Sequence, residues 1–182
     1  MSYITEMGYH GTNQESAESI MSSCYNQSRG NDHWLGDGVY FFNSEKMAFE
    51  WCKSEGYKHK WEAYAILLNQ LRVKQKEILD LRNPDEADFF HSYRDLLIER
   101  IRKGEFSVRA RNRNDLDGLI FNELCSVIPY KMLILGTFVK ISRDRKYRYF
   151  SRVPNCIIFC VRDNTCINMP PTLVREGVFD ER

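Results

Sequence analysis

Short apolar segments recur along the chain, and they limit the folds that it can adopt. Seven of these segments are apolar or aromatic and are bounded by polar or glycine-containing turns, which predicts strands. They cover residues 7–12, 38–42, 63–68, 77–81, 117–124, 131–141 and 155–163. The residues from 168 onward show no clear periodicity. We therefore expect a core built around a sheet.

Segments with helical periodicity alternate with the strands. Residues 12–23 and 43–56 predict capped helices, and Thr12 or Asn13 caps the first of them. The clearest helix runs from Pro84 to Lys103, because proline suits a first turn, acidic residues follow it and basic residues end it. The predicted fold class is α+β, and 182 residues suffice for one domain with its own core, spanning residues 1–182.

Composition narrows the class of protein. The formal net charge of +1 gives the chain no overall attraction to nucleic acid or anionic lipid. No apolar run reaches membrane-spanning length, and the N-terminus lacks a secretory signal pattern, so we expect a cytoplasmic protein without membrane contact. The six cysteines include no CxxC pair, so we expect free structural thiols and no metal site. A strand would place Cys156 and Cys160 on the same face.

Two glycine-punctuated segments carry the candidate site. Residues 8–12 are GYHGT, and residues 34–42 are WLGDGVYFF. A glycine beside His10 allows a ligand to approach the backbone, and strand alternation places Tyr40 and Phe42 on the same face. Each segment alone is typical of an ordinary core strand. Their occurrence in this order favours two walls of one pocket.

In this order, the segments resemble the ADP-ribosyltransferase superfamily, in its poly-ADP-ribose-polymerase-like and diphtheria-toxin-like branch. That branch has a strand with His-Gly-[Ser/Thr] followed by a strand with Gly-x-Gly-[Ile/Val/Phe]-Tyr. The matching residues are His10, Gly11 and Thr12, then Gly36, Gly38, Val39, Tyr40 and Phe41, followed by a helix with Ala48 and Trp51. The resemblance is strong over residues 8–52 and implies an ADP-ribosyltransferase-like split β-sheet core with flanking helices.

The resemblance also implies the roles of these residues toward NAD, the co-substrate. The backbone of Gly11 would hold the nicotinamide carboxamide, and His10 would bond a ribose hydroxyl. Tyr40 would lie against one face of the nicotinamide ring, and Trp51 or Phe49 against the other, which suits a flat and partly cationic ring. The NAD-binding residues implied in this way are His10, Gly11, Thr12, Gly38, Tyr40, Phe49 and Trp51.

The third member of the family's His-Tyr-Glu triad is open. We favour Glu123 as the catalytic partner of His10 and Tyr40, with Glu176 or Asp117 as alternatives. A competing alignment makes residues 155–163 the equivalent strand. It places Cys156, Ile157 or Ile158 at the position of the glutamate and supplies no carboxylate.

The expected activity is mono-ADP-ribosyl transfer with release of nicotinamide. We expect a toxin or defence effector that modifies a nucleic acid or a protein of the translation machinery, with nucleic acid slightly favoured, and a neutralising antitoxin as a further partner. Two basic clusters underlie the preference for nucleic acid. They are Arg100, Arg102, Lys103, Arg109, Arg111 and Arg113, and Arg143, Arg145, Lys146, Arg148 and Arg152. The alternatives are a catalytically silent protein that binds NAD or ADP-ribose, and a nucleic-acid-binding module without activity.

Overall fold

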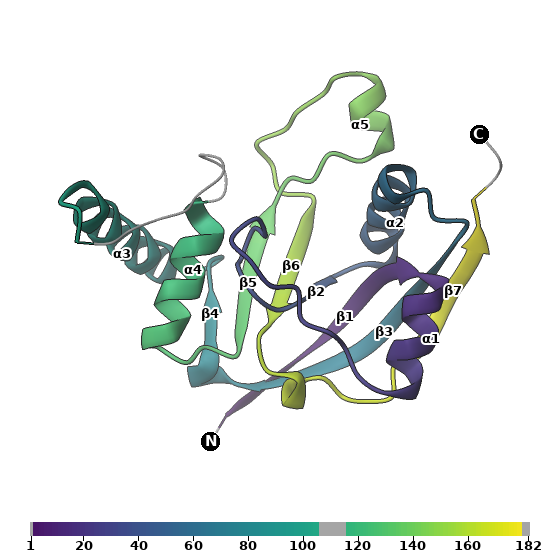
Figure 1. The fold of residues 1–182 in the computed structure, drawn as a ribbon, viewed down its shortest axis with the longest axis horizontal. Coiled ribbons are helices and arrows are strands. Elements are labelled where there is room, and N and C mark those ends of the chain that lie inside the picture. Colours follow the sequence, from purple (N-terminus) through teal and green to yellow (C-terminus); the bar gives the residue numbers. More distant parts are fainter. Residues whose placement is uncertain (1, 106–115, 180–182) are drawn as a thin grey trace.

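Seven strands form one sheet in the computed structural model, which describes residues 2–105 and 116–179. They are β1 (Tyr3–Asn13), β2 (Val39–Phe42), β3 (Ala63–Lys74), β4 (Ile78–Asp80), β5 (Met132–Thr137), β6 (Cys156–Val161) and β7 (Thr172–Val178). The order across the sheet is β4-β5-β6-β2-β1-β3-β7 (Figure 1), and only β4 and β5 run parallel. The predicted mixed α+β class is confirmed.

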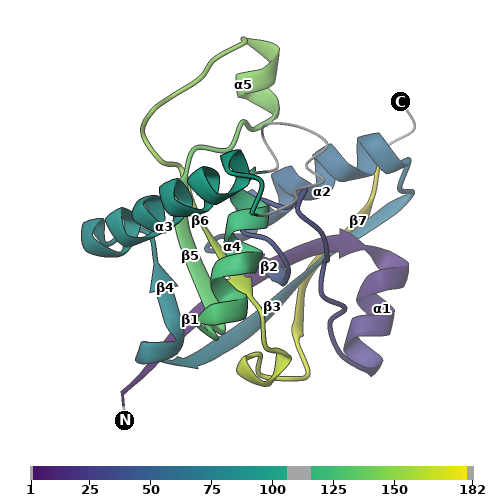
Figure 2. The same cartoon turned by 60° about the vertical axis from the view of Figure 1, so that its left-hand side comes forward.

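Helices cover both faces of this sheet. They are α1 (Gln14–Ser22), α2 (Glu45–His59), α3 (Pro84–Arg102), α4 (Leu116–Val127) and the short α5 (Ser142–Lys146), with 3-10 turns at Gln75–Glu77 and Asn164–Cys166. One apolar cluster joins α2, α3 and α4 to the sheet, and a second joins α1 to it. Figures 1 and 2 show α3 and α4 together beside β4 and β5. Strand alternation divides the sheet residues between these clusters. Phe42 belongs to the first cluster and Tyr40 packs against it, whereas Val39 and Phe41 belong to the second, as predicted.

The sheet is nearly interrupted between β1 and β2. These strands pair at one position, Tyr9 with Phe42, whereas β1 pairs with β3 along its whole length. In Figure 1, β1 and β3 run obliquely to β5 and β6. The sheet therefore consists of two halves, β4-β5-β6-β2 and β1-β3-β7, that meet at a single pair. Next to this pair, the side chain of His10 bonds the backbone oxygen of Tyr40 across the junction.

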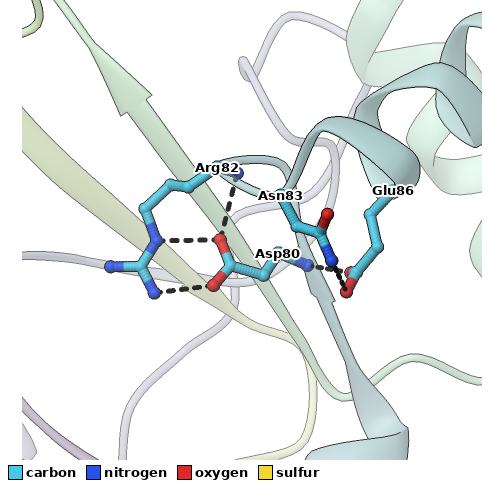
Figure 3. Close-up of polar contacts among 4 residues, drawn as sticks. All are labelled: Asp80, Arg82, Asn83 and Glu86. Atoms are coloured by element: carbon cyan, nitrogen blue, oxygen red, sulfur yellow. Dashed lines mark hydrogen bonds and ion pairs between the residues drawn. The ribbon is translucent and has the colours of Figure 1, made fainter.

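The corner between β4 and α3 is held by side chains (Figure 3). Arg82 donates from Nε and Nη2 to the two carboxylate oxygens of Asp80, at 2.8 and 2.6 Å, and its backbone N–H also bonds Asp80. Glu86 accepts from the backbone N–H of Asp80 and from Asn83. Asn83 caps α3 by accepting from the N–H of Asp85. This bidentate pair and cap fix the direction in which α3 leaves the sheet.

Most predicted elements are confirmed, with shifted ends. The helix from Pro84 begins at that residue and ends at Arg102. Asn13 caps α1 by accepting from the N–H of Ser16 at 2.7 Å. Cys156 and Cys160 are buried in the same cluster, and all six cysteines are free. The predicted strand over 131–141 ends earlier, at Thr137.

One strand prediction is wrong. Residues 117–124 are helical and belong to α4, because an apolar run of this length fits a buried helix as well as a strand and the packing decides. The aperiodic tail contains β7, an edge strand whose exposed side chains show no apolar alternation. It forms by backbone pairing with β3. The predicted basic residues Arg109, Arg111 and Arg113 lie outside the described residues.

Candidate functional site

A cavity of about 450 Å³ lies where the two halves of the sheet meet. It is lined by His10, Gly11 and Thr12 of β1, by Val39, Tyr40 and Phe42 of β2, and by Ile158 of β6. The loop between α1 and β2 contributes Asn26, Ser28, Asp32, His33 and Trp34, and α2 and the turn after it contribute Trp51, Glu55, Lys58 and Trp61. The structure thus brings the two glycine-punctuated segments together around one cavity.

His10 is a neutral imidazole with one nitrogen left to accept. Its Nδ1 lies 2.8 Å from the backbone oxygen of Tyr40, and since a carbonyl only accepts, Nδ1 carries the proton. The ring packs edge-on against Tyr25 at 5.0 Å. Burial lowers the pKa of His10 and outweighs the opposite effect of the bond to Tyr40. Nε2 is therefore unprotonated and suited to accept a bond from a hydroxyl group.

The ring of Tyr40 lines the cavity, whereas its hydroxyl is bonded to the protein backbone. The hydroxyl donates to the backbone oxygen of Gly36 at 2.6 Å and accepts from the N–H of Leu35 at 3.0 Å. Burial, together with the nearby Cys160, raises the pKa of Tyr40 far above its ordinary range. The side chain is thus a fixed aromatic surface and does not exchange protons near neutral pH.

The loop that bonds Tyr40 is itself held by Asn122. The Oδ1 of Asn122 accepts from the N–H of Asp37 at 2.8 Å and from Arg162 at 3.1 Å. Its Nδ2 donates to Asn31 and Asp37, both at 3.2 Å. Gly36 has φ +72°, and a Cβ there would lie 2.3 Å from Asn122 Oδ1. Only glycine allows this close approach.

Asn122 and Arg162 were not predicted as site residues. Asn122 directly precedes Glu123 in the sequence. The resemblance pointed to Glu123 and gave no role to Asn122. A half-buried amide that bonds four groups is visible only after the chain folds, because its partners come from two distant segments.

Gly11 serves the packing of β1 on α2. A Cβ at this position would lie 2.6 Å from the backbone oxygen of Ala48 and from Cys52 Sγ. Glycine therefore lets helix and strand approach closely, and its backbone still borders the cavity. Thr12 lines the cavity beside it, whereas Gly38 packs against Cys160 and is not among the lining residues.

Trp51 and Phe49 were the two residues predicted to face the second side of the nicotinamide ring. Trp51 lines the cavity and Phe49 does not. Trp51 is 39% exposed and lies 6.1 Å from the ring of Phe42. Phe49 instead lies under the guanidinium of Arg175 at 3.8 Å and packs on Tyr64. It does not line the cavity. Trp34, which is 48% exposed, is a further aromatic wall that the sequence did not indicate.

None of the predicted carboxylates lines this cavity. Glu123 lies on α4, close enough to α3 for its charge to add to the effect of burial in raising the pKa of Tyr93. Asp117 begins α4 and borders a different cavity. Glu176 is exposed on the edge strand β7. Ile158, one of the three residues that the competing alignment puts at the glutamate position, pairs with Phe42 in β6 and lines the cavity.

Two other carboxylates line the cavity. Asp32 is exposed on the loop, and Glu55 projects from the end of α2. Glu55 contacts His59 at 3.1 Å and Lys58 at 3.6 Å, so its charge is partly balanced. Lys58 places a cation at the same rim. Sequence patterning did not indicate these residues, since charged residues at a helix end are ordinary.

The buried cysteines are poor nucleophiles. Burial raises the pKa of Cys52 and of Cys160 to about 12 in each case, so both remain thiols near neutral pH. Within residues 2–105 and 116–179, no three His, Cys, Asp or Glu side chains gather as a metal site requires. No helix in that part of the chain is long and apolar enough to cross a membrane.

Comparisons with known proteins leave the family open. No family model matches the chain, and no solved structure matches it. An uncharacterised protein of the archaeon Methanocaldococcus jannaschii is 39% identical over 84 residues. The alignment covers 44% of this chain and 39% of the archaeal protein, so it spans less than half of either.

Proposed function

We propose that the chain has an ADP-ribosyltransferase-like fold, binds NAD in the cavity between His10 and Tyr40, and transfers a single ADP-ribose with release of nicotinamide. One observation carries the proposal. The sheet nearly separates between β1 and β2, and the hydrogen bond from His10 Nδ1 to the Tyr40 backbone spans that junction. The residues that carry the family resemblance therefore converge on one ligand-sized cavity.

The residues present fit the parts of NAD. A volume of about 450 Å³ lies within the usual range for small-molecule sites. Tyr40 and Trp51 offer aromatic faces to the nicotinamide ring, which attract a flat cationic group by about 1 kcal/mol or more. His10 Nε2 can accept from a ribose hydroxyl, and Lys58 can approach a phosphate. When bound, NAD supplies the ADP-ribosyl group through its breakable bond to nicotinamide.

The chain's own contribution is orientation and balance of charge. The backbone bonds of the Tyr40 hydroxyl hold its ring still, and the clamp at Asn122 holds the loop that accepts them. Such fixed positioning lowers a barrier without any covalent step by the protein. Asp32 and Glu55 are the carboxylates placed to offset positive charge that develops in the cavity.

Ile158 favours transfer of one ADP-ribose over chain growth. It stands at the head of β6, beside Phe42 of β2, and brings no carboxylate to the cavity. Members of the resembling family that lack the glutamate often transfer one unit, cleave NAD slowly or are inactive. The same observation supports a second candidate function, a silent protein that binds NAD or ADP-ribose without turnover.

Release of nicotinamide from NAD, measured by chromatography, tests the proposal. We expect the parent chain to release nicotinamide and His10→Ala to lose at least tenfold of the rate, as loss of a positioned hydrogen-bonding group should. Glu123→Gln is the control and should change the rate less than twofold, because Glu123 lies outside the cavity. Binding of NAD without release would favour the silent protein, and loss of release in Glu123→Gln alone would contradict the assigned site.

The acceptor and the biological role form part of the proposal. A macromolecular acceptor, with nucleic acid favoured, and a role as a toxin or defence effector with a neutralising partner rest on family analogy. Labelled NAD incubated with a cell lysate, followed by separation of protein from nucleic acid, assigns the label to one class of acceptor. Label in neither fraction would contradict macromolecular transfer.

A further inference from the structure

A basic and aromatic arm projects from the sheet between β5 and β6. The arm comprises residues 138–155 and includes α5 (Figure 1). It contains six basic residues and one acid, Asp144, so its net charge is +5, while the whole chain carries +1 and the remainder therefore −4. The basic residues are Lys140, Arg143, Arg145, Lys146, Arg148 and Arg152, and all are exposed. Although the net charge of the whole chain is close to zero, its excess of positive charge is concentrated in the arm.

The charge of the arm is not neutralised by the rest of the fold. Among residues 2–105 and 116–179, none of these six cations takes part in an ion pair. Three aromatic side chains lie between them: Tyr147, Tyr149 and Phe150 are 70%, 56% and 63% exposed. Water-exposed rings interleaved with cations that form no ion pair are the pattern that binds bases and phosphates of a single strand.

The arm is fixed in place. Glu50 of α2 accepts from both the backbone N–H and the hydroxyl of Ser142, at 2.8 and 2.7 Å. The side chain of Asn155 exchanges two hydrogen bonds of 2.9 Å with the backbone of Val139 and closes the base of the arm. Asp144 is buried and caps the first turn of α5 through the N–H of Ile141. The basic side chains are thus presented on a preorganised support.

A second cavity of about 390 Å³ opens at the base of the arm. Phe138, the first residue of the arm, lines it together with Trp34, and Phe90 and Phe121 stack beneath at 4.2 Å. Asp117, His91 and Thr137 supply polar groups to the same space. Trp34 also lines the first cavity, so the two cavities share a wall.

We infer that the arm and the second cavity form one binding site for single-stranded nucleic acid, with phosphates on the arm and a base in the cavity. A base is flat, as the aromatic walls require, and carries donors and acceptors at its edge for the polar groups. An anionic membrane would also attract the arm but would leave a recessed aromatic cavity without a role. We assign this nucleic acid as the acceptor of the proposed transferase, and that assignment rests on the proposed function.

The test is binding of labelled single-stranded RNA and DNA to the full chain, without NAD, followed by fluorescence anisotropy over about 50 to 200 mM salt. We expect the combined change Arg145→Gln, Arg148→Gln and Arg152→Gln to weaken binding at least tenfold and to reduce the logarithmic salt slope by about 2, at about 0.7 per phosphate contact. The matched control, Lys46→Gln, Lys60→Gln and Lys76→Gln, removes the same charge from exposed sites outside the arm and should change binding less than threefold.

Phe138→Ala separates stacking from charge. We expect about fivefold or greater loss of affinity with an unchanged salt slope, because stacking involves no counterion release. Circular dichroism should show that each variant keeps its fold. Preference for RNA or DNA identifies the sugar that the site accepts.

Four results would overturn the inference. They are no binding at low salt, equal losses in the two triple variants, equal affinity for duplex, and arm-dependent binding to phosphatidylserine vesicles in place of oligonucleotides. Because no NAD is present, failure here is distinct from failure of nicotinamide release.

Discussion

The ring of Tyr40 lines the cavity and its hydroxyl bonds the loop backbone, so substitutions can test the two groups separately. Tyr40→Phe removes the hydroxyl and keeps the ring, whereas Tyr40→Leu removes both. In either variant, the N–H of Leu35 and the backbone oxygen of Gly36 lose their partner. Leu35 is fully buried and Gly36 is also buried, so neither group gains water in exchange.

The expected loss of stability follows from these two groups. A buried polar group left without a partner costs about 1–3 kcal/mol. We expect Tyr40→Phe to lower the free energy of unfolding by about 2–4 kcal/mol, which lowers the melting temperature by about 5–15 °C in a chain of this size. Urea denaturation followed by circular dichroism measures this loss. A Phe variant as stable as the parent would show that the hydroxyl does not hold the loop.

The ring has a separate readout. At a temperature where both variants are folded, Tyr40→Phe should retain nicotinamide release within about threefold, because the aromatic face remains. Tyr40→Leu should lose about tenfold or more, corresponding to about 1–2 kcal/mol of stacking and cation–π attraction. The parent rate in both variants would refute the use of the ring face, whereas an equal loss in both would assign a catalytic role to the hydroxyl.

Three further predictions concern the surroundings of the site. Burial lowers the pKa of His10 below 6.5, so the unfolded chain takes up its proton first and stability is lost as pH falls from about 6.5 through the lower folded pKa. His10→Gln should flatten the pH dependence of urea unfolding between about pH 7 and 5, and an unchanged slope would contradict the burial of this imidazole. Asn122→Ala should cost about 2–4 kcal/mol in urea unfolding, because the N–H of Asp37 loses its partner and Arg162 keeps only its bond to the Asp37 backbone oxygen, and a cost below about 1 kcal/mol would refute the clamp. Glu50→Ala should speed hydrogen–deuterium exchange in the arm, because Ser142 loses both of its bonds, whereas unchanged exchange would show that the arm is held elsewhere.

Local patterns predicted the elements whose signals are local. Capping residues and charge placement located the helix from Pro84, and strand alternation separated Tyr40 from Phe41. The ordered pair of glycine-containing segments predicted that His10 and Tyr40 share a cavity, and the structure brings them together. These features depend on neighbours within a few residues, so the sequence displays them directly.

Features set by tertiary contacts escaped prediction. The segment around Glu123 folds as a helix because its apolar residues pack against both α3 and the sheet, a context that the run itself does not encode. The edge strand β7 depends on backbone pairing with β3. Asp32 and Glu55 reach the cavity only through the path of the loop and the end of α2. The pairing of Ile158 with Phe42 likewise depends on the strand order, which the sequence does not display.

A crystal structure with a non-hydrolysable NAD analogue would show whether NAD binds between His10 and Tyr40. We predict a nicotinamide ring against Tyr40 and Trp51, with a ribose hydroxyl donating to His10 Nε2. The Tyr40 hydroxyl should keep its bonds to the loop backbone in that complex. An analogue bound away from His10 and Tyr40, or no binding at millimolar concentration, would contradict this prediction.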